Sequence, residues 1–467
     1  MDAAGTFGLE SFGQDHFGRC ELDDARLTAR LVATANRIMK HPGGTLPQKL
    51  ADSASLMGMY RLANNHKVTH EKLMEGPFAR TREQMARAIG VVLVIHDTTE
   101  ADFSGLDVEG LGQIGHGGCR GFLVHNSLAY DYPRREVIGL ASQVLHVRRE
   151  VPPEETHRQK RENPDRESLL WKKGWERLGP PPVGKMRVNI CDRGGDTFEF
   201  MEAMDQAGDH YCIRSKSNRK LEPRGSDADS ELRLHDWART LPTLGFRTVS
   251  VQANGDQKAR EARVEVAASP LSLPAPCWVC GLHSRRDQSV WVVHVRESDP
   301  PPDCTALEWV LLTNVPTDGF EAACVRIDWY AKRPVVEEYH KAMKTGCGVE
   351  AQQFTTLKAL QVTLGLLSVV AVQLLRLRDL SRREEMATRA ADEVVEGAYV
   401  TVLSLWRFGE DKPKMSVRDF CLALAKLGGH LNRKQDKPPG WMVLWRGWTK
   451  LQLLMVGAQA AGLRKCV

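Results

Sequence analysis

Short apolar runs alternate with polar connections through the middle of the chain, whereas its two ends show the spacing of helices. Residues 91–95 (VVLVI) are all apolar, which predicts a buried strand that ends at His96-Asp97. Helices are predicted at about 153–178 and at 198–206. Further strands are predicted at 121–129, 137–147, 186–191 and 211–213.

A long segment from Arg214 to about Thr313 contains alternating apolar and polar residues between Gly, Pro and Asp turns, which predicts a β-rich insertion. The predicted strands in it are at 247–252, 262–267, 290–296 and 309–313. Helices resume at about 320 and dominate to the C-terminus. The apolar stretch 364–375 is shorter than the ~20 residues of a membrane span, which favours a buried core helix.

Length and composition describe a soluble globular protein. A chain of 467 residues is too long for one core, so two or three domains are expected. Hydrophobic residues make up 42% and charged residues 26%, which excludes a disordered protein. A net charge of +5 permits an anionic partner without requiring one. The positions of the charges must therefore decide whether the partner is anionic.

The eleven cysteines are scattered, and the first residues contain acidic side chains and no apolar signal segment. Both observations favour a reducing, cytoplasmic environment with free thiols. Cys277 and Cys280, together with His283, have the spacing of half a metal site. No second pair follows at finger spacing, which argues against a structural metal there.

The N-terminal region contains a helix with cations on one side. Asp23 or Asp24 can cap a helix that runs to about Lys40. A one-sided stripe of cations is typical of a helix that lies on nucleic acid, and a plain solvated face is the alternative. The cations within this narrow arc are Arg26, Arg30, Arg37 and Lys40.

Two carboxylates share one context. Asp97 and Asp192 each follow an apolar strand, and ligands and metals gather at strand ends in α/β sheets. An aspartate there can instead cap the next turn. If the strands are neighbours, the two carboxylates repel and call for a divalent cation such as Mg²⁺ or Mn²⁺. Glu337 would complete a three-carboxylate site for two metal ions about 4 Å apart.

The segment around Glu337 has the pattern Y-x2-R-x3-E-x6-K, formed by Tyr330, Arg333, Glu337 and Lys344. On an uninterrupted helix, Glu337, Lys341 and Lys344 fall on one face and apolar residues on the other. A carboxylate that holds a metal beside cations that bind phosphate suits phosphodiester chemistry, and a solvated helix face is the alternative. Pro334 predicts that the helix begins or kinks there.

With these residues, the chain resembles the bacterial cut-and-paste DDE transposases with the YREK signature, the insertion-sequence-four group. The resemblance runs nearly end to end. The matching segments are 23–31 (DDARLTARL), 95–99 (IHDTT), 191–193 (CDR), 214–216 (RSK), 309–313 (WVLLT), 327–348 and 440–451 (GWMVLWRGWTKL).

The resemblance implies an α/β protein with an RNase-H-like catalytic core and a β insertion. It implies that Asp97, Asp192 and Glu337 are the catalytic residues and hold two Mg²⁺ ions, for which Mn²⁺ can substitute. Glu338 is the adjacent competitor, and the signature spacing selects Glu337. The implied parts are a helical DNA-end-recognition domain (1–75), a catalytic domain (76–372, insertion about 214–313) and a helical dimerisation domain (373–467).

The resemblance also assigns DNA contacts. Trp309 would stack on a base flipped out of the duplex, and a core aromatic is the alternative. Arg214 and Lys216 would follow the DNA backbone, and the N-terminal helix would read the terminal inverted repeat. The residues implied to hold DNA phosphates are Tyr330, Arg333 and Lys344, with Lys341 beside them.

The C-terminal helix carries Trp441, Trp445, Trp448 and Met455 on one stripe, which favours core packing. The family suggests a homodimer contact there, within a synaptic complex of two DNA ends.

The implied reaction cuts the element ends through a 3′-hydroxyl and a hairpin, and then joins them to target DNA. The alternatives are an inactive DNA-binding relative or transposition inhibitor, an RNase-H-like nuclease without strand transfer, and a carboxylate-pair hydrolase acting on sugars.

Overall fold

The computed structural model describes residues 11–41, 43–221, 232–251, 259–276, 283–302 and 304–462. Ten strands of these residues form one mixed sheet, in the order β2-β3-β1-β5-β6-β10-β9-β8-β7, with β4 also paired to β3. The strands are β1 (Val91–Asp102), β2 (Gly112–Gln113), β3 (Arg120–Asp131), β4 (Glu136–His146), β5 (Met186–Cys191), β6 (His210–Arg214), β7 (Gly245–Val251), β8 (Arg260–Leu273), β9 (Gln288–Glu297) and β10 (Glu308–Thr313).

The sheet is parallel at its centre and antiparallel on both sides of it. Strands β1, β3 and β4 form an antiparallel meander, β5 and β6 run parallel to β1, and β10 returns antiparallel to β6. The predicted strands are confirmed as elements. The prediction that the first strand ends before Asp97 is wrong, because β3 continues to pair with β1 as far as Asp102. Asp97 therefore lies inside a strand.

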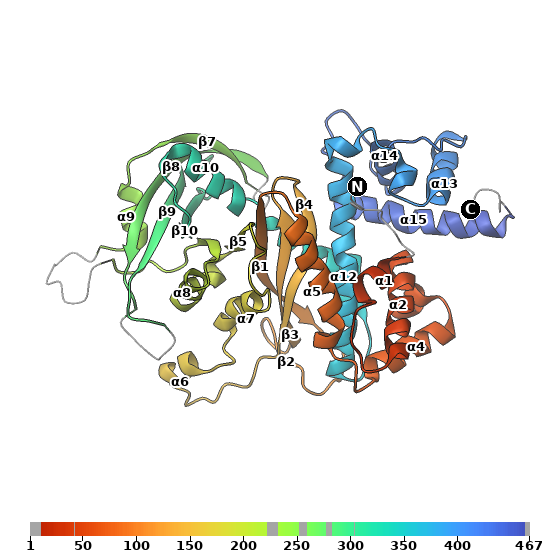
Figure 1. The fold of residues 1–467 in the computed structure, drawn as a ribbon, viewed down its shortest axis with the longest axis horizontal. Helices are drawn as coiled ribbons and strands as arrows, with labels where there is room; N and C mark the ends of the chain where they lie inside the picture. Colours follow the sequence, from red (N-terminus) through yellow and green to blue (C-terminus); the bar gives the residue numbers. More distant parts are fainter. Residues whose placement is uncertain are drawn as a thin grey trace.

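Helices cover both faces of the sheet (Figure 1). Helices α5 (His70–Arg87) and α12 (Leu357–Arg382) pack on β4, while α7 (Leu170–Glu176) lies over β3 and β4 and α8 (Phe198–Gln206) over β6. Among the described helices, only α12 is long and apolar enough to cross a membrane, and 89% of its most apolar window is buried inside the protein. The prediction of a buried core helix is confirmed.

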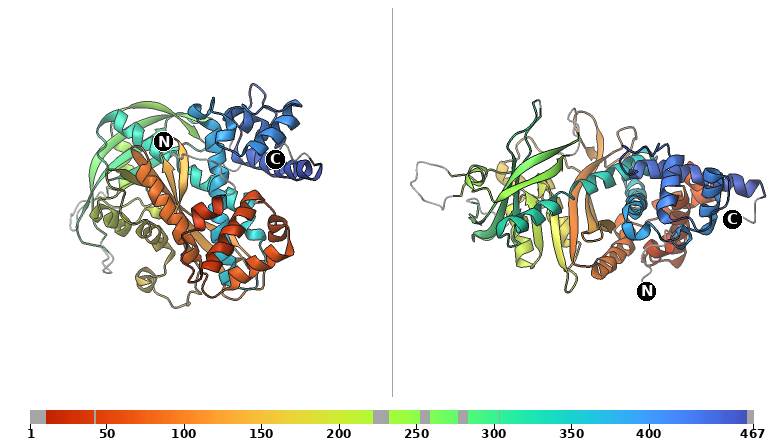
Figure 2. Two further views of the ribbon diagram at one scale, coloured as in Figure 1. Left: turned by 45° about the vertical axis from the view of Figure 1, so that its right-hand side comes forward. Right: turned by 90° about the horizontal axis from the view of Figure 1, so that it is seen from above.

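The N-terminal and C-terminal helices lie on the same side of the molecule, next to α12 (Figure 2). Helix α2 begins after Asp24, whose side chain accepts a hydrogen bond from the backbone N–H of Arg26, so the predicted capped helix is confirmed. Trp441, Trp445, Trp448 and Met455 are all buried, as the core-packing interpretation predicted. The helices are α1 (Phe12–Phe17), α2 (Ala25–Lys40), α3 (Leu46–Leu50), α4 (Ser53–Asn64), α13 (Gly397–Phe408), α14 (Val417–Leu427) and α15 (Trp441–Ala460).

The β insertion extends the sheet beyond β6 and is followed by the helices that carry the signature residues. Cys277 and Cys280 lie outside the described residues. The remaining helices are α6 (His157–Glu162), α9 (Leu234–Thr240), α10 (Gly319–Tyr330) and α11 (Pro334–Lys341), with short turns at Glu167–Leu169, Arg193–Gly195, Val349–Ala351, Glu384–Met386 and Ala391–Glu393 and a π-helical turn at Ala342–Gly346.

Candidate active site

The parallel pairing of β1 with β5 brings two aspartates together. The paired register runs to His96 opposite Cys191, so Asp97, within β1, and Asp192, directly after β5, are the next residues along the chain. Strand β5 ends there, and the Asp192 side chain accepts a hydrogen bond from the backbone N–H of Gly194 at 2.9 Å. The prediction that the two strands are neighbours is confirmed.

Glu337 comes from the helix that begins at Pro334. Helix α10 ends at Tyr330, and Pro334 is the first residue of α11, where its missing N–H costs no helical hydrogen bond. Arg333 precedes this proline and its side chain reaches the carboxylate of Glu337, one helical turn ahead. The predicted helix start at Pro334 is confirmed.

The three carboxylates meet on one guanidinium. Arg333 Nη2 lies 3.1 Å from Asp97 Oδ2 and 3.5 Å from Asp192 Oδ2, and its Nη1 contacts Glu337 Oε1. Only 19% of the Arg333 side chain is exposed. Three carboxylates and one cation leave the cluster with an excess of negative charge, which suits a cationic ligand.

Asp97 is the most buried of the three carboxylates, at 8% exposure. Burial raises the pKa of Asp97 to about 7, against the opposing effect of Arg333; Asp192 and Glu337 add to the rise. Asp97 therefore gains its charge at higher pH than an ordinary carboxyl, and a bound cation would favour that charged form.

A histidine that the sequence did not single out borders Asp97. His340 Nδ1 lies 3.8 Å from Asp97 Oδ2, while its Nε2 accepts a hydrogen bond from Asn126 Nδ2 at 3.0 Å. Burial lowers the pKa of His340 to about 3, and Lys344 and Arg333 add to the effect. Asn126 is in turn held by Gln143 Nε2 at 2.7 Å. His340 lies three residues after Glu337, one turn along the helix, and that spacing was the only signal available in the sequence.

The adjacent carboxylate, Glu338, points elsewhere. It contacts Arg378 on α12, whose Nη2 also lies 2.6 Å from Asp379. Glu338 therefore belongs to an ion-pair cluster between α11 and α12, and Glu337 is the carboxylate that joins Asp97 and Asp192.

The two lysines of the segment, Lys341 and Lys344, lie in different surroundings. Helix α11 ends at Lys341, and a π-helical turn follows over Ala342–Gly346. The wider turn changes the rotation per residue between Lys341 and Lys344. Lys341 is exposed, whereas Lys344 Nζ lies 3.0 Å from Glu350 Oε1.

Trp309 and Tyr330, two of the predicted DNA contacts, form an aromatic pair. The rings of Trp309 and Tyr330 meet edge to face, with centroids 5.1 Å apart, and Tyr330 is 6% exposed. Burial raises the pKa of Tyr330 to about 12. Arg214 Nη2 donates to the backbone carbonyl of Glu308, next to Trp309, at 2.9 Å. Lys216 is exposed on the strand-end loop that follows Arg214.

The cations of α2 lie away from this cluster, on the N-terminal helices. Arg26, Arg30 and Arg37 are exposed and Lys40 is half-buried. Arg26 Nη2 lies 3.0 Å from Asp24, and Arg37 contacts Asp52.

The donor set fits a hard divalent cation, since all three side chains offer carboxylate oxygens. Within the described ranges, no group of three His, Cys, Asp or Glu side chains is gathered closely enough to hold a metal ion. The guanidinium of Arg333 contacts all three carboxylates, so it would compete with a bound cation for their oxygens.

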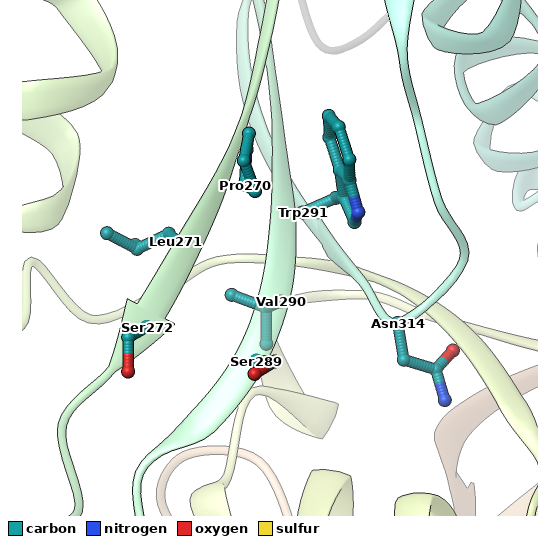
Figure 3. A pocket seen from close by; sticks show the side chains of 7 residues that line it. All are labelled: Pro270, Leu271, Ser272, Ser289, Val290, Trp291 and Asn314. Atoms are coloured by element: carbon teal, nitrogen blue, oxygen red, sulfur yellow. The ribbon is translucent and has the colours of Figure 1, made fainter.

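A pocket of about 360 Å³ lies outside the cluster, between β8, β9 and the residue that follows β10 (Figure 3). Trp291, Ser289 and Asn314 line it. Asn314 Nδ2 donates hydrogen bonds to Asp205 Oδ1 at 2.7 Å and to the backbone carbonyl of Asp209 at 2.8 Å. These contacts give Asn314 a structural role.

Residues 9–68 match a family model described as transposase DNA-binding. The matched residues include helices α1 to α4, and so the cations of α2. A piggyBac transposase synaptic complex with hairpin DNA is a similar solved structure, at 10% identity and a TM-score of 0.33. The match covers 98% of this chain and 75% of that one.

Proposed function

We propose that this protein is a cut-and-paste DNA transposase that cleaves the ends of a mobile element and joins them to target DNA. The observation that carries the proposal is the meeting of Asp97, Asp192 and Glu337, from two parallel strands and a helix, on one guanidinium. It occurs in a chain whose residues 9–68 match the transposase DNA-binding family.

The strand order supports an RNase-H-like core within the proposal. An antiparallel meander of β4, β3 and β1, continued by β5 and β6 parallel to β1, is the arrangement of such a core. The insertion strands β7, β8 and β9 come between Asp192 and Glu337 in the chain, as in the YREK transposases that the sequence resembles.

Asp97, Asp192 and Glu337 would hold Mg²⁺ or Mn²⁺. When bound there, a pair of such ions activates the attacking oxygen and stabilises the leaving oxygen. Protonated Asp97 is a poor ligand, so its deprotonation accompanies binding.

Arg333 has two roles in the proposal. Before DNA arrives, it neutralises part of the carboxylate charge. A DNA phosphate can accept two hydrogen bonds from a guanidinium, as a carboxylate does. Arg333 can therefore leave the carboxylates and bind the phosphate when DNA and metal enter the site. Lys344 and Lys341 would add positive charge along the same segment.

Trp309 and Tyr330 would hold an extruded base and its phosphate. Trp309 is half-buried and its ring meets that of Tyr330, so a base would have to enter beside this pair. Tyr330 remains protonated at neutral pH because its pKa is about 12. Its hydroxyl would donate a hydrogen bond to phosphate and would not act as a nucleophile.

The reaction would proceed by successive phosphoryl transfers at one site. Water would free a 3′-hydroxyl at the element end, this hydroxyl would form a hairpin on the opposite strand, and water would reopen it. The 3′-hydroxyl would then attack target DNA. A homodimer that pairs two ends, in the bacterial cytoplasm, would complete the proposed assembly.

The test is a cleavage and joining assay with the DNA ends that flank the gene. Wild-type protein with Mg²⁺ should nick and then separate the ends, and should join them to a supercoiled target plasmid. Asp192→Ala should do neither, and equal products from both proteins would contradict the proposal.

The same assay separates the alternatives. Cleavage without joined products would favour a nuclease on the same core. Binding of the ends without cleavage by wild-type protein would favour an inhibitor or DNA-binding relative. Activity on a glycoside that resists chelators would favour a sugar hydrolase.

A further inference from the structure

Asp196 ties together two loops of the proposed site. It is 6% exposed and lies four residues after Asp192, at the end of the short turn Arg193–Gly195. Its Oδ2 accepts hydrogen bonds from the backbone N–H of Lys216 at 2.6 Å and of Ser217 at 3.0 Å. These partners belong to the loop that follows β6, so one carboxylate spans the loops after two adjacent strands.

The second oxygen of Asp196 faces a cation. Its Oδ1 lies 2.6 Å from Arg219 Nη1, and Arg219 Nη2 also donates to the Asp196 backbone carbonyl at 2.9 Å. The hydroxyl of Ser215 lies 3.4 Å from Oδ2. A buried carboxylate that accepts several charge-assisted hydrogen bonds holds its partners more firmly than a neutral side chain would.

The turn between Asp192 and Asp196 packs so closely on Trp171 and Cys191 that its two glycines have no space for a side chain. A Cβ placed on Gly194 would lie 2.2 Å from an indole carbon of Trp171, and one on Gly195 would lie 2.6 Å from Cys191 Cβ. A short, closely packed turn therefore separates Asp192 from Asp196, and Asp196 binds the backbone of the loop after β6.

We propose that Asp196 is a positioning residue that sets Arg214 and Lys216 at a fixed place relative to Asp192. The inference rests on the proposed function, in which these two cations contact the DNA backbone. Arg214 and Lys216 flank Ser215, whose backbone N–H is also held, by the Val310 carbonyl at 2.7 Å. A DNA phosphate bound by this loop would then meet the carboxylates in a set register, which favours reaction over mere binding.

A double-mutant cycle in the full-length protein tests the inference. Wild-type protein, Asp196→Asn, Lys216→Ala and the double variant are compared for affinity to a labelled duplex across a salt series. Lys216→Ala removes the charged side chain and keeps the backbone N–H that Asp196 binds. It should weaken binding several-fold and lower the salt slope by about 1.

Asp196→Asn should lower the affinity and the salt slope, as Lys216→Ala does. In the Lys216→Ala background it should lower them little further, because both changes act through the Lys216 side chain. Amide hydrogen exchange of Lys216 and Ser217 is the second measurement. Both amides should be protected in wild-type protein and should exchange faster in Asp196→Asn. Asp165→Asn, an exposed aspartate paired with Lys173, is the matched control.

The outcomes are distinguishable. If Lys216→Ala weakens binding but Asp196→Asn leaves affinity and salt slope at wild-type values, the positioning role is overturned. The role is also overturned if the two effects are fully additive. If Lys216→Ala itself has no effect, the DNA contact on which the inference rests is overturned as well.

Discussion

Cations occur in two different settings in this protein. On α2, Arg26, Arg30 and Arg37 are exposed, and Arg26 and Arg37 each pair with one carboxylate. At the carboxylate cluster, Arg333 is largely buried and faces three carboxylates at once. Exposed pairs contribute about 0–1 kcal/mol to stability, whereas breaking a buried pair costs about 3–5 kcal/mol.

The two settings suit the two roles proposed for these cations. An exposed cation changes the fold little when it leaves its partner, so it is free to contact DNA phosphates. A buried cation among carboxylates neutralises part of their charge, so its departure costs more unless another cation replaces it. Charge alone does not separate these two roles, but burial does.

The largest expected effect is on the rate of strand cleavage, and it distinguishes two adjacent glutamates. Glu337→Gln should lower strand cleavage by about 10³-fold or more, since it removes an anionic group from the reacting centre. Glu338→Gln is the matched control and should retain cleavage, because that residue pairs with Arg378. Gel-based cleavage rates, with melting temperatures for both variants, check this. Equal losses from the two would remove Glu337 from the site.

The next effect is on stability and contrasts the two settings directly. Arg333→Ala should destabilise the protein by about 3 kcal/mol without metal, because three carboxylates lose their shared cation. Arg37→Ala should cost less than about 1 kcal/mol. Denaturant unfolding measures both.

Mn²⁺ sharpens this comparison. It should stabilise Arg333→Ala more than wild-type protein, since the ion takes the vacated position. Equal stabilisation of both proteins by Mn²⁺ would contradict the idea that Arg333 and metal compete.

The α2 cations should matter for DNA rather than for stability. Replacing Arg26, Arg30 and Arg37 with Ala should lower the salt slope of duplex binding by about 3, because each phosphate contact contributes about 0.9. Fluorescence anisotropy between 50 and 200 mM salt measures the slope. Arg158→Ala, an exposed arginine on α6 that pairs with Glu162, is the control and should leave the slope unchanged.

The smallest effect is on pH dependence. The pKa of Asp97 is raised by burial to about 7, so the folded protein binds this proton more tightly than the unfolded chain does. This contribution to stability is present below the unfolded pKa of about 4 and is lost as pH rises through about 7.

Between pH 4 and pH 7, the melting temperature of Asp97→Asn should therefore fall less than that of wild-type protein. The difference between the two falls should be on the order of 2–4 °C. Thermal unfolding without metal measures it, with Asp165→Asn as the control. A profile for Asp97→Asn that parallels wild-type protein would assign the pH dependence to other groups.

The sequence predicted the strands well because their apolar runs are short and bounded by turns. It failed at Asp97, where a polar stretch still pairs with β3 and so continues β1 to Asp102. It also gave no sign of the π-helical turn at Ala342–Gly346, because such a turn leaves no mark in residue spacing. His340 and Asp196 were missed because their roles come from Asn126 and Lys216, which are distant in the chain.

By itself, the sequence determined the elements, the capped α2 helix and the three carboxylates, because these depend on periodicity, local capping and residue type. The tertiary structure gave the physical reason that Glu337 and not Glu338 joins the aspartates, since packing turns Glu338 toward Arg378 and Glu337 toward Arg333. It also decided that Arg333 lies among the carboxylates and that Asp97 is buried beside His340. Burial and charge pairing arise between segments far apart in the chain, so no local pattern could have fixed them.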